Sequence, residues 1–392
     1  MNILHISPYF PDIDENHAGG VCMGKSIETL KKQHKVYVLT FVASELDRQI
    51  AQKYKNDFYY KTVPINKGTR LFHVLLNPFL PNFFAARSSF RFAFHLIQMI
   101  RRHQIEAIHV EYASMGQYIW LIRRFFPLLR VYMVEHDVTA QSYERKVMQS
   151  KGIKRLYYKW QHTRIVATEG KYCRSATAIL VFNEKDRELI SRYYKVSEVK
   201  VLNPYYGIES QRMQCAEKIT HHDASICFLG QMGRRENYEA AGRLIRISQK
   251  IKIHIPELQV YIVGNGPPKE LKKLQNEYIH ITGFVEDVDQ YLLSSQLAVF
   301  PLTLGAGIKL KVLRSLALGI PVVTGKVGAE GIDEAGDVIT LAETDIEYEE
   351  AVKSLLGNQK RRCELSRRSR EYVNEKFGWD KSEVILYDMY KA

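Results

Sequence analysis

The stretch "PLTLGAGIKLKVLRSLALGIPVV" occupies residues 301–323 and contains the pattern that decides the fold. An apolar run ends in a turn at Gly305 and Gly307, and the spacing of apolar residues then predicts an amphipathic helix over Ile308–Leu318. Gly-Ile-Pro stops that helix before the next apolar run. A strand, a turn, a helix and a second buried strand in this order are typical of parallel α/β sheets.

The same alternation continues in both directions along the chain. The predicted strands of the first half are "NILHIS", "KVYVLT", "IEAIHVEY", "RVYMVEH" and "ATAILVFN", and those of the second half are "ASICFLG", "LQVYIVG", "IHITGFV", "LAVFPL", "IPVVTG" and "DVITL". Between the halves, Asn203–Glu209 contains proline and glycine and is predicted to be a linker. We therefore expect an α/β protein with two Rossmann-like, doubly wound parallel-sheet domains that face a central cleft.

Length, composition and charge narrow the class of protein. The chain has 392 residues, more than one core normally serves, and its 46% hydrophobic and 25% charged residues are ordinary for a soluble globular protein. The formal net charge of +13 predicts attraction to polyanions such as anionic lipid head groups or phosphorylated molecules. The start "MNILHISPYF" does not resemble a signal peptide, and no apolar run reaches about 18 residues, so we expect a cytoplasmic protein.

The cysteines are dispersed and odd in number. None of them forms a pair at metal-ligand spacing, which predicts free thiols in a reducing compartment and no metal site. They are Cys22, Cys173, Cys215, Cys227 and Cys363.

The turn over Gly305–Lys309 has the features of an anion-binding site. Backbone N–H groups at a helix N-terminus lack partners within the helix and attract anions, and glycines leave room for a phosphate. Lys309 falls in the predicted first helical turn, where a cation opposes the helix dipole, so a phosphate is the better reason for it. The alternative is a plain turn in which glycine supplies backbone freedom, and this segment alone does not decide between the two.

Further motifs give this turn a context. "GGVCMGKSIETL", "VEHDVT" and "FNEKDRELI" lie in the first half, and "GQMGRRENYEA", "VGNGP", "ITGFVED", residues 300–323 and "GAEGI" lie in the second. With these motifs the chain resembles, over nearly its whole length, the family-4 retaining glycosyltransferases of the glycosyl transferases group 1. The resemblance implies a GT-B fold with an acceptor-binding domain over 1–204, a nucleotide-sugar-binding domain over 205–375, and a C-terminal helix at 376–392 that crosses back to the first domain.

The resemblance also implies which residues bind the donor. Glycine turns and basic side chains of both domains approach the donor diphosphate in the family, and the matching positions are Gly19, Gly20, Gly230, Arg234, Arg235, Gly305, Gly307, Lys309 and Arg314. Arginine suits this role because its planar fork pairs with two phosphate oxygens at once. The alternatives are a tight turn before a helix for Gly19 and Gly20, and a solvated pair of charges for Arg234 and Arg235.

His136 in "EHDV" matches the family's histidine near the reacting sugar, which makes His136 and Asp137 the candidate catalytic residues. A lone histidine after a strand is more often structural, so this assignment rests mainly on the resemblance. Asp137 would either orient His136 or cap the following helix. Glu169 matches a family glutamate on a long helix, and we expect it to be structural.

Two acids of the family are absent. The family has two glutamates separated by seven residues, of which the first touches the donor sugar and the second usually holds the ribose. Ala306 and Arg314 occupy these positions, although relatives that lack the first glutamate share the Lys309 and Lys311 pattern. Arg314 would contact a phosphate or ribose as a donor, or another group would hold the ribose, or the protein is a partner subunit with weak donor binding. We favour the first, because Lys311 and Arg314 fall on one helix face and repel each other unless an anion lies between them.

The segment from Phe58 to Ile105 contains no aspartate or glutamate, although it is rich in phenylalanine and basic residues. Its part from Leu71 to Arg102 is predicted to be a loop and a helix, the latter from Arg87, with an apolar face and a basic rim, which favours an anionic membrane surface as a partner. The alternative is a helix packed on the sheet. A second basic run over Arg145–Arg174 supports an anionic surface or a phosphate-bearing acceptor, and no recognisable nucleic-acid module is present.

These observations and the resemblance together predict the reaction. A sugar would pass, with retention, from a nucleotide sugar of the UDP or GDP type to a lipid-linked or polysaccharide hydroxyl in cell-envelope glycan assembly. We expect neither a metal nor a cofactor besides the donor, no nucleic-acid partner, and a position in the cytoplasm at the inner face of the plasma membrane. The alternative is a catalytically silent GT-B protein that acts as a binding or scaffold subunit.

Overall fold

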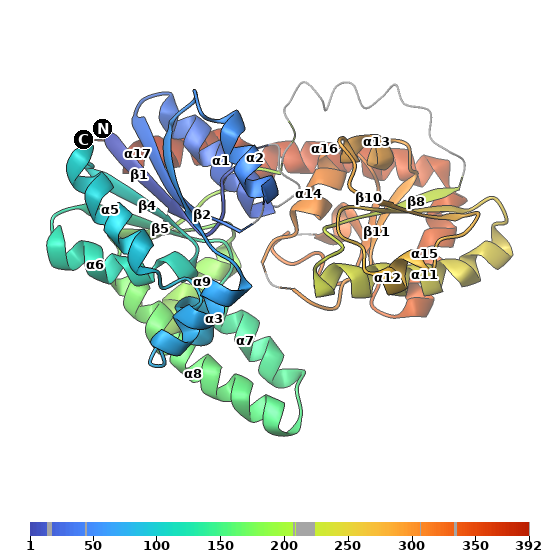
Figure 1. Ribbon diagram of the computed structural model, residues 1–392. Helices are drawn as coiled ribbons and strands as arrows, with labels where there is room; N and C mark the ends of the chain where they lie inside the picture. Colours follow the sequence, from blue (N-terminus) through green and yellow to red (C-terminus); the bar gives the residue numbers. More distant parts are fainter. Residues whose placement is uncertain are drawn as a thin grey trace. The chain divides into compact units, whose positions relative to one another are not determined.

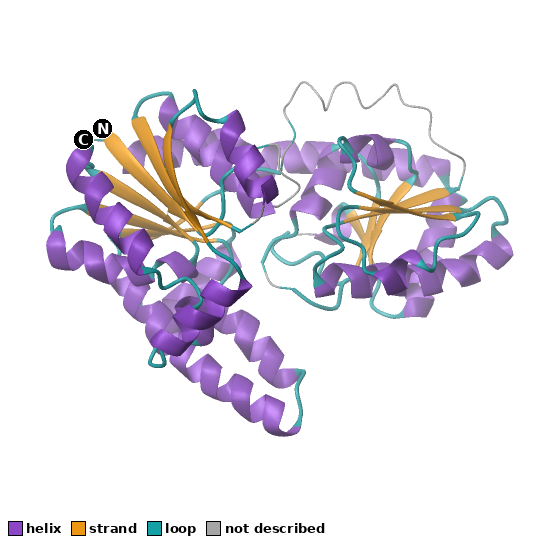
Figure 2. Cartoon of the chain, in the orientation of Figure 1, coloured by secondary structure: helices purple, strands orange, loops and turns teal. Residues whose placement is uncertain are grey.

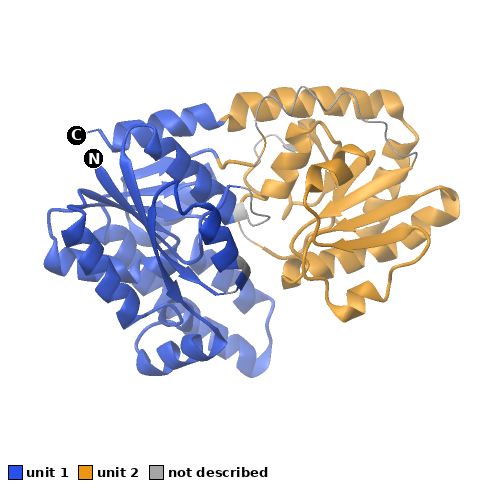
Figure 3. Cartoon of the chain, turned by 45° about the horizontal axis from the view of Figure 1, so that its top comes forward, with its two compact units in different colours: residues 1–15, 19–203, 379–392 blue, residues 16–18, 204–378 orange. Residues whose placement is uncertain are grey.

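The computed structural model of the chain describes residues 1–13, 18–43, 45–206, 208, 224–305, 307–332 and 335–391. It divides into two compact units, which Figure 3 shows in different colours. Unit 1 comprises Met1–Glu15, Gly19–Asn203 and Trp379–Ala392, and unit 2 comprises residues 16–18 and Pro204–Gly378. The division after Asn203 falls beside the predicted boundary at 204, and the last helix belongs to unit 1.

Unit 1 is built on a parallel sheet of seven strands in the order β3-β2-β1-β4-β5-β6-β7. Its strands are β1 (Asn2–Ser7), β2 (Lys35–Val42), β3 (Tyr59–Pro64), β4 (Ala107–Glu111), β5 (Arg130–Glu135), β6 (Ala178–Val181) and β7 (Val199–Val201). The central strands are buried along their length because helices cover both faces of the sheet (Figure 2). The order reverses between β1 and β4, the position where such sheets bind ligands.

The helices of unit 1 follow the strands in alternation (Figure 1). They are α1 (Ala18–Lys31), α2 (Glu45–Lys53), α3 (Lys67–Leu76), α4 (Asn82–Ala85), α5 (Phe90–Arg102), the 3-10 helix η1 (Ala113–Met115), α6 (Gln117–Phe125), α7 (Thr139–Met148), α8 (Gly152–Ser175), α9 (Glu184–Tyr194) and α17 (Trp379–Met389). The last of these is fixed to unit 1 by side-chain hydrogen bonds. Trp379 Nε1 donates to Thr29 Oγ1 at 2.9 Å, and the Tyr132 hydroxyl donates to the Met389 carbonyl at 2.7 Å.

Unit 2 repeats the architecture with a parallel sheet of six strands in the order β10-β9-β8-β11-β12-β13. The strands are β8 (Ser225–Leu229), β9 (Gln259–Val263), β10 (Ile279–Gly283), β11 (Leu297–Phe300), β12 (Val322–Thr324) and β13 (Ile339–Leu341). The helices are α11 (Arg235–His254), α12 (Lys269–Lys272), α13 (Val288–Leu293), α14 (Leu310–Ala317), η3 (Ala335–Asp337), α15 (Asp345–Leu356) and α16 (Gln359–Phe377). Each unit has a large hydrophobic core of its own, as expected for two domains.

The sequence predicted the central strands and missed two edge strands. Only Val63 of β3 is buried, and β7 is three residues long, so neither has the continuous apolar run of a buried strand. The helix predicted over Ile308–Leu318 is shorter and begins at Leu310. Among the described residues, no helix has the length and hydropathy needed to cross a membrane.

The acid-free segment does not form a single membrane-facing helix. The helix predicted from Arg87 begins at Phe90, and α5 buries Phe92, Leu96, Met99 and Ile100 against the sheet. For this helix the alternative of packing on the sheet is therefore correct. Helix α3, earlier in the same segment, behaves differently, because none of its ten residues is buried.

Candidate functional site

The glycine turns of unit 2 meet at the carboxyl-terminal edge of its sheet. The turn after β8 begins at Gly230, and the turn after β9 contains Gly264 and Gly266. The Met232 amide donates to the Asn265 carbonyl at 2.7 Å, and a side chain at Gly264 would collide with the Gly230 carbonyl oxygen. The backbones of the two turns are thus in direct contact, which only residues without side chains allow.

Lys311 connects α14 to the turn after β8. Its Nζ donates to Asn237 Oδ1 at 2.6 Å and lies 4.7 Å from the centre of the Phe228 ring. It also lies 3.1 Å from the place that a Cβ atom of Gly230 would occupy. Burial lowers the pKa of Lys311 to about 7, and the positive charge of Lys309 adds to this effect. An amine that loses its proton near neutral pH is therefore held beside the predicted phosphate turn at Gly230.

The backbone conformation of the turn after β11 favours glycine at two positions. Gly305 and Gly307 have φ angles of 117° and 68°, in the region that favours glycine. Lys309 is the N-cap of α14 and not part of its first turn, so the expected conflict with the helix dipole is smaller than predicted. Its Nζ donates to the Gly307 carbonyl and lies 3.5 Å from Glu330 Oε2. The family's first acid position, Ala306, lies outside the described residues.

Arg314 is held by a carboxylate of unit 2 itself. Its Nε and Nη2 donate to the two oxygens of Asp289 at 2.6 and 3.0 Å, and Nη1 donates to the Tyr206 carbonyl at 3.4 Å. The argument that Lys311 and Arg314 need an external anion between them is wrong, because Lys311 turns to Asn237 and Asp289 supplies the anion for Arg314. A contact between Arg314 and a donor would have to share the guanidinium with Asp289.

Arg234 and Arg235 lie at the start of α11, directly after the Gly230 turn. Each is more than half exposed and pairs at 2.6 Å with a glutamate of its own helix, Glu236 and Glu239 respectively. Exposed pairs of this kind contribute little stability and exchange easily with a phosphate. Both guanidinium groups are thus compatible with donor binding and with the alternative of a solvated pair.

In unit 1, His136 lies directly after β5 and is fixed on two sides. Its ring stacks on Tyr112, with centroids 3.8 Å apart and planes 3° from parallel. Its Nε2 lies 2.6 Å from Glu111 Oε2, so the imidazole donates to a buried carboxylate. The ring orientation and the protonated nitrogen are therefore set by the protein, as a histidine that contacts a substrate requires.

Glu111 is a site residue that the sequence did not reveal. Its Oε1 accepts from Nε2 of His5 at 3.0 Å and of His109 at 3.1 Å, and His109 Nδ1 accepts from the Tyr390 hydroxyl at 2.6 Å. Burial alone would raise the pKa of Glu111, but the hydrogen bonds from His109, His136 and His5 outweigh it and hold that pKa well below its usual range.

The strands explain why these groups meet. The register of β1 with β4 places His5 opposite His109, and Glu111 lies two residues further along the same face of β4. Two polar residues at alternate positions within the apolar run "IEAIHVEY" were the available signal. The partners of these two residues come from distant parts of the chain, so no local sequence pattern indicated the network itself.

His5, His109 and Glu111 are the described residues that bring three potential metal-ligand atoms together, within 4.8 Å of one another. The same atoms already satisfy each other as hydrogen-bond donors and acceptor. Each imidazole donates its Nε2 proton to Glu111, so these three atoms are already paired, whereas Nδ1 of His5 is buried without a hydrogen-bond partner in the described part of the chain.

Gly19 is linked to His136 through a tyrosine pair. A side chain at Gly19 would collide with the hydroxyls of Tyr9 and Tyr112, which are hydrogen-bonded to each other. Tyr112 is the residue on which His136 stacks. Gly19 and Gly20 belong to the first turn of α1, and the Gly20 carbonyl accepts from the Asp12 amide at 3.3 Å. The close approach to the two tyrosines explains the glycine at position 19. Gly19 and Gly20 lie inside α1 and not in a tight turn before it, and their role in donor binding stays a prediction.

The helix after His136 is capped from another helix. The N-cap of α7 is Val138, and Glu169 of α8 accepts from the amides of Thr139 and Ala140 at 2.9 and 3.0 Å. Capping, one of the two roles expected for Asp137, is thus performed by Glu169, in agreement with the structural role expected for Glu169. Asp137 itself is half-buried beside His136.

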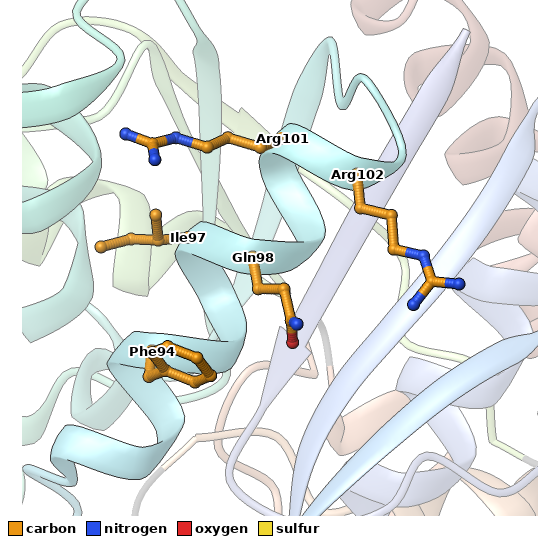
Figure 4. Close-up of a pocket in the computed structure, with 5 residues that line it drawn as sticks. All are labelled: Phe94, Ile97, Gln98, Arg101 and Arg102. Carbon is orange, nitrogen blue, oxygen red and sulfur yellow. The ribbon is translucent and has the colours of Figure 1, made fainter.

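A surface pocket lies elsewhere in unit 1. Figure 4 shows its lining residues Phe94, Ile97, Gln98, Arg101 and Arg102, all of which project from α5. It contains none of the predicted site residues, and Arg101 packs over the Phe126 ring at 5.9 Å. The four cysteines in the described part of the chain, at positions 22, 173, 227 and 363, are free thiols, and Cys215 lies outside it.

Comparison with known proteins bears on both units. Residues 223–358 match the family model described as Glycosyl transferases group 1. No curated protein sequence is significantly similar to the chain. Among solved structures, sucrose-phosphate synthase from Thermosynechococcus elongatus aligns with a TM-score of 0.71 and 15% identity, over 99% of this chain and 98% of that chain.

Two further structures are similar over their full length. A mutant of S. aureus TarM, solved with fondaparinux, alpha-GlcNAc-glycerol and UDP, aligns with a TM-score of 0.70 and 11% identity over 99% of both chains. WaaG, a glycosyltransferase involved in lipopolysaccharide biosynthesis, aligns with a TM-score of 0.67 and 15% identity over 98% of this chain and 99% of that chain. The chain therefore has the GT-B fold, and its second unit carries the domain of a nucleotide-sugar-dependent glycosyltransferase of group 1.

Proposed function

We propose that the protein transfers a sugar from a nucleoside-diphosphate sugar, of the UDP or GDP type, to an acceptor hydroxyl. The observation that carries the proposal is the contact between the Gly230 and Gly264 turns beside Lys311, within the segment that matches Glycosyl transferases group 1. Structures of TarM and of the Anabaena protein HepE with UDP support this donor class.

The leaving diphosphate is the group that needs stabilisation in this reaction. Negative charge develops on it as the bond to the sugar breaks, and fixed positive groups lower the barrier most where that charge grows. Amides at the start of α11, the exposed Arg234 and Arg235, and Lys309 supply such groups in the proposal. Basic side chains here take the part that a divalent cation plays elsewhere.

His136 and the neighbouring Asp137 are the proposed catalytic residues of unit 1. Glu111 and Tyr112 hold the imidazole in one orientation, in which Nε2 donates to the carboxylate. The acceptor oxygen bonds to the anomeric carbon as the phosphate oxygen leaves, and the hydroxyl proton passes to that departing oxygen. Attack from the face that the diphosphate leaves gives retention, and it needs no pair of glycosidase carboxylates.

The acceptor in this proposal is lipid-linked or a polysaccharide, as in cell-envelope glycan assembly, and the protein acts in the cytoplasm at the inner face of the plasma membrane. The net charge of +13 supports an anionic surface as a partner. The role of WaaG in lipopolysaccharide biosynthesis is in keeping with such an acceptor.

One observation favours a second candidate, a catalytically silent GT-B subunit. Arg314 stands where the family has the acid that usually holds the ribose, and Asp289 occupies its guanidinium. A guanidinium cannot accept hydrogen bonds from ribose hydroxyls. Donor binding without that contact would be weaker, as expected for a subunit that does not turn over a donor.

Turnover separates the two candidates. The protein is incubated with UDP-, GDP- and ADP-sugars and with lipid-linked or glycan acceptors, and released nucleoside diphosphate and the anomeric configuration of the product are measured by NMR. We expect one donor to turn over with retention and His136→Ala to lose about 10²-fold or more. The matched control is His280→Ala, another histidine stacked on a tyrosine, Tyr261, but on the edge strand β10. Donor binding without turnover would favour the silent subunit.

A further inference from the structure

Helix α3 leaves most of its apolar side chains exposed. Its ten residues include none that is buried, although a helix of a soluble domain normally buries one stripe. The side chains of this helix and the loop after it that are between 51% and 94% exposed are Leu71, Phe72, Leu75, Leu76 and Phe79. An exposed apolar cluster of this size marks an interaction site.

The first turns of α8 expose a second apolar face. Ile153, Leu156, Tyr157 and Trp160 are between 42% and 86% exposed. They follow each other at intervals of three, one and three residues, which places them on one side of the helix. The helix pair α7 and α8 projects from the sheet at the lower end of unit 1 (Figure 1), so this face of α8 is not covered by the sheet.

Hydrogen bonds join the segment after α3 to α8. Arg164 Nη2 donates to the Pro78 carbonyl at 2.6 Å, and Asn82 Nδ2 donates to the Tyr157 hydroxyl at 3.0 Å. The Asn82 amide also donates to Gln161 Oε1 at 3.2 Å. The segment after α3 is thus fixed to α8, and the apolar side chains of both helices belong to one region of unit 1, here called the α3–α8 surface.

The charge of the α3–α8 surface has one sign. No aspartate or glutamate occurs over 58–105 or over 145–168. The basic residues among the apolar ones are Lys67, Arg70, Lys151, Lys154, Arg155 and Lys159. Arg164 lies over the Trp160 ring at 4.3 Å. A partner of this surface must therefore be negatively charged and must also accept aliphatic side chains.

A bilayer with anionic head groups meets both conditions. Leucine and isoleucine side chains enter the boundary of the acyl region, aromatic side chains lie at its edge, and lysine and arginine contact head groups. Single-stranded nucleic acid would require flat aromatic platforms, whereas leucine and isoleucine supply more than half of the nine apolar side chains.

We propose that the α3–α8 surface docks the protein on anionic bilayers. This inference rests on the membrane part of the proposed function and names the surface that performs it. It also moves that surface away from α5, whose apolar face is buried, to helices that the sequence places far apart.

Vesicle co-sedimentation tests the proposal. The full chain is mixed with vesicles of neutral phosphatidylcholine and with vesicles that contain phosphatidylglycerol in addition. We expect binding to the anionic vesicles, weakened by salt within the range where the Debye length falls below about 10 Å. Leu71→Ser with Leu75→Ser, and separately Lys154→Glu with Lys159→Glu, should each lower binding at least about tenfold.

Two variants serve as controls. Ile253 is exposed between Lys252 and His254 on α11 of unit 2, so Ile253→Ser removes an exposed apolar side chain beside a cation and should leave binding unchanged. Phe94→Ser tests the exposed face of α5. Loss of binding in Phe94→Ser but not in the α3 and α8 variants would overturn the proposal, and so would a wild-type protein that binds neither vesicle.

Nucleotide binding and turnover on a water-soluble acceptor are measured in the same variants. They should keep wild-type values, because the surface lies outside the proposed site. Normal turnover without vesicle binding would refute the docking surface alone. Vesicle binding without any nucleotide binding would refute the proposed donor site and leave the surface standing.

Discussion

The two units build their candidate sites from different material. In unit 2, glycine backbones of neighbouring turns meet at the ends of strands, and Lys311 lies beside them. In unit 1, the imidazoles of His5, His109 and His136 converge on the buried carboxylate of Glu111, and Tyr390 donates to His109. The unit 2 site requires that no side chain fills the space between its turns. The unit 1 site requires that the buried negative charge keeps its hydrogen-bond donors. The two should therefore fail in different ways when single residues change.

Glu111→Gln should have the largest effect on stability. The change removes a buried anion that accepts hydrogen bonds from three imidazoles, and each hydrogen bond to a charged group contributes about 1.5–3 kcal/mol. The folded-state pKa of Glu111 lies well below its usual range, so its contribution is present above the unfolded-state pKa and disappears as pH falls through the folded-state pKa. Urea denaturation at pH 7 and at pH 4 measures the loss of stability and its dependence on pH.

Glu135→Gln is the matched control on the neighbouring strand. Burial, together with the nearby charges of Glu169 and Asp137, raises the pKa of Glu135 well above its usual range. These surroundings favour the neutral form of the carboxyl, which an amide resembles, so Glu135→Gln should cost less stability than Glu111→Gln. Equal losses in Glu111→Gln and Glu135→Gln would contradict the distinction between a charged and a neutral buried acid.

Gly264→Ala should break the unit 2 site by collision. The added Cβ meets the Gly230 carbonyl, and the φ angle of 138° is unfavourable for alanine, so we expect a loss of about 2–4 kcal/mol and weaker nucleotide binding. Gly283→Ala separates the two causes, since Gly283 has a φ of 74° but nothing within 4 Å of the new Cβ. A similar loss of stability in both variants would mean that backbone strain, and not the contact between the turns, explains why position 264 requires glycine.

Arg314→Ala tests whether the pair with Asp289 is structural. Loss of charge-assisted hydrogen bonds to a buried carboxylate should cost about 1.5–3 kcal/mol, and Arg314→Lys should recover only part of it because lysine lacks the planar fork. Thermal denaturation and nucleotide titration are run on the same samples. Unchanged stability with a lower nucleotide affinity would instead assign Arg314 to the donor.

Lys311 should make the stability of unit 2 depend on pH, with a smaller effect than the substitutions above. Burial lowers its pKa to about 7, so between pH 7 and its unfolded-state pKa the unfolded chain binds the extra proton and stability rises with pH. We expect a gain of about 1–2 kcal/mol from pH 7 to pH 9 that Lys311→Met abolishes. A pH profile that is identical in both proteins would contradict the buried, easily deprotonated amine.

The contrast between the two units also explains which features could be predicted from the sequence. The buried central strands and the glycine turns after β8, β9 and β11 were predicted, because each is a local pattern of apolar runs and missing side chains. Glu111 escaped because its importance comes from partners more than a hundred residues away, such as His5. Asp289 escaped because its partner Arg314 lies 25 residues further along the chain, on another element, and with Asp289 the explanation of Arg314 was missed.

The surface over α3 and α8 shows the limit most clearly. The phenylalanines and basic residues before Ile105 indicated an interface, but composition does not say which helix packs on the sheet. Helix α5 uses its apolar side chains for the core, whereas α3 leaves them exposed. Its neighbour α8 lies more than seventy residues further along the chain, and only the fold brings the two together.

The central claim, that unit 2 binds a nucleoside diphosphate at its glycine turns, is tested most directly by calorimetric titration of UDP and GDP. Wild type should bind one of them saturably at or below millimolar concentration. Lys309→Ala, which removes the amine beside the Gly305–Gly307 turn, should weaken that binding about tenfold, and Lys360→Ala on α16 should not. No binding of either nucleotide to the wild type at millimolar concentration would contradict the account.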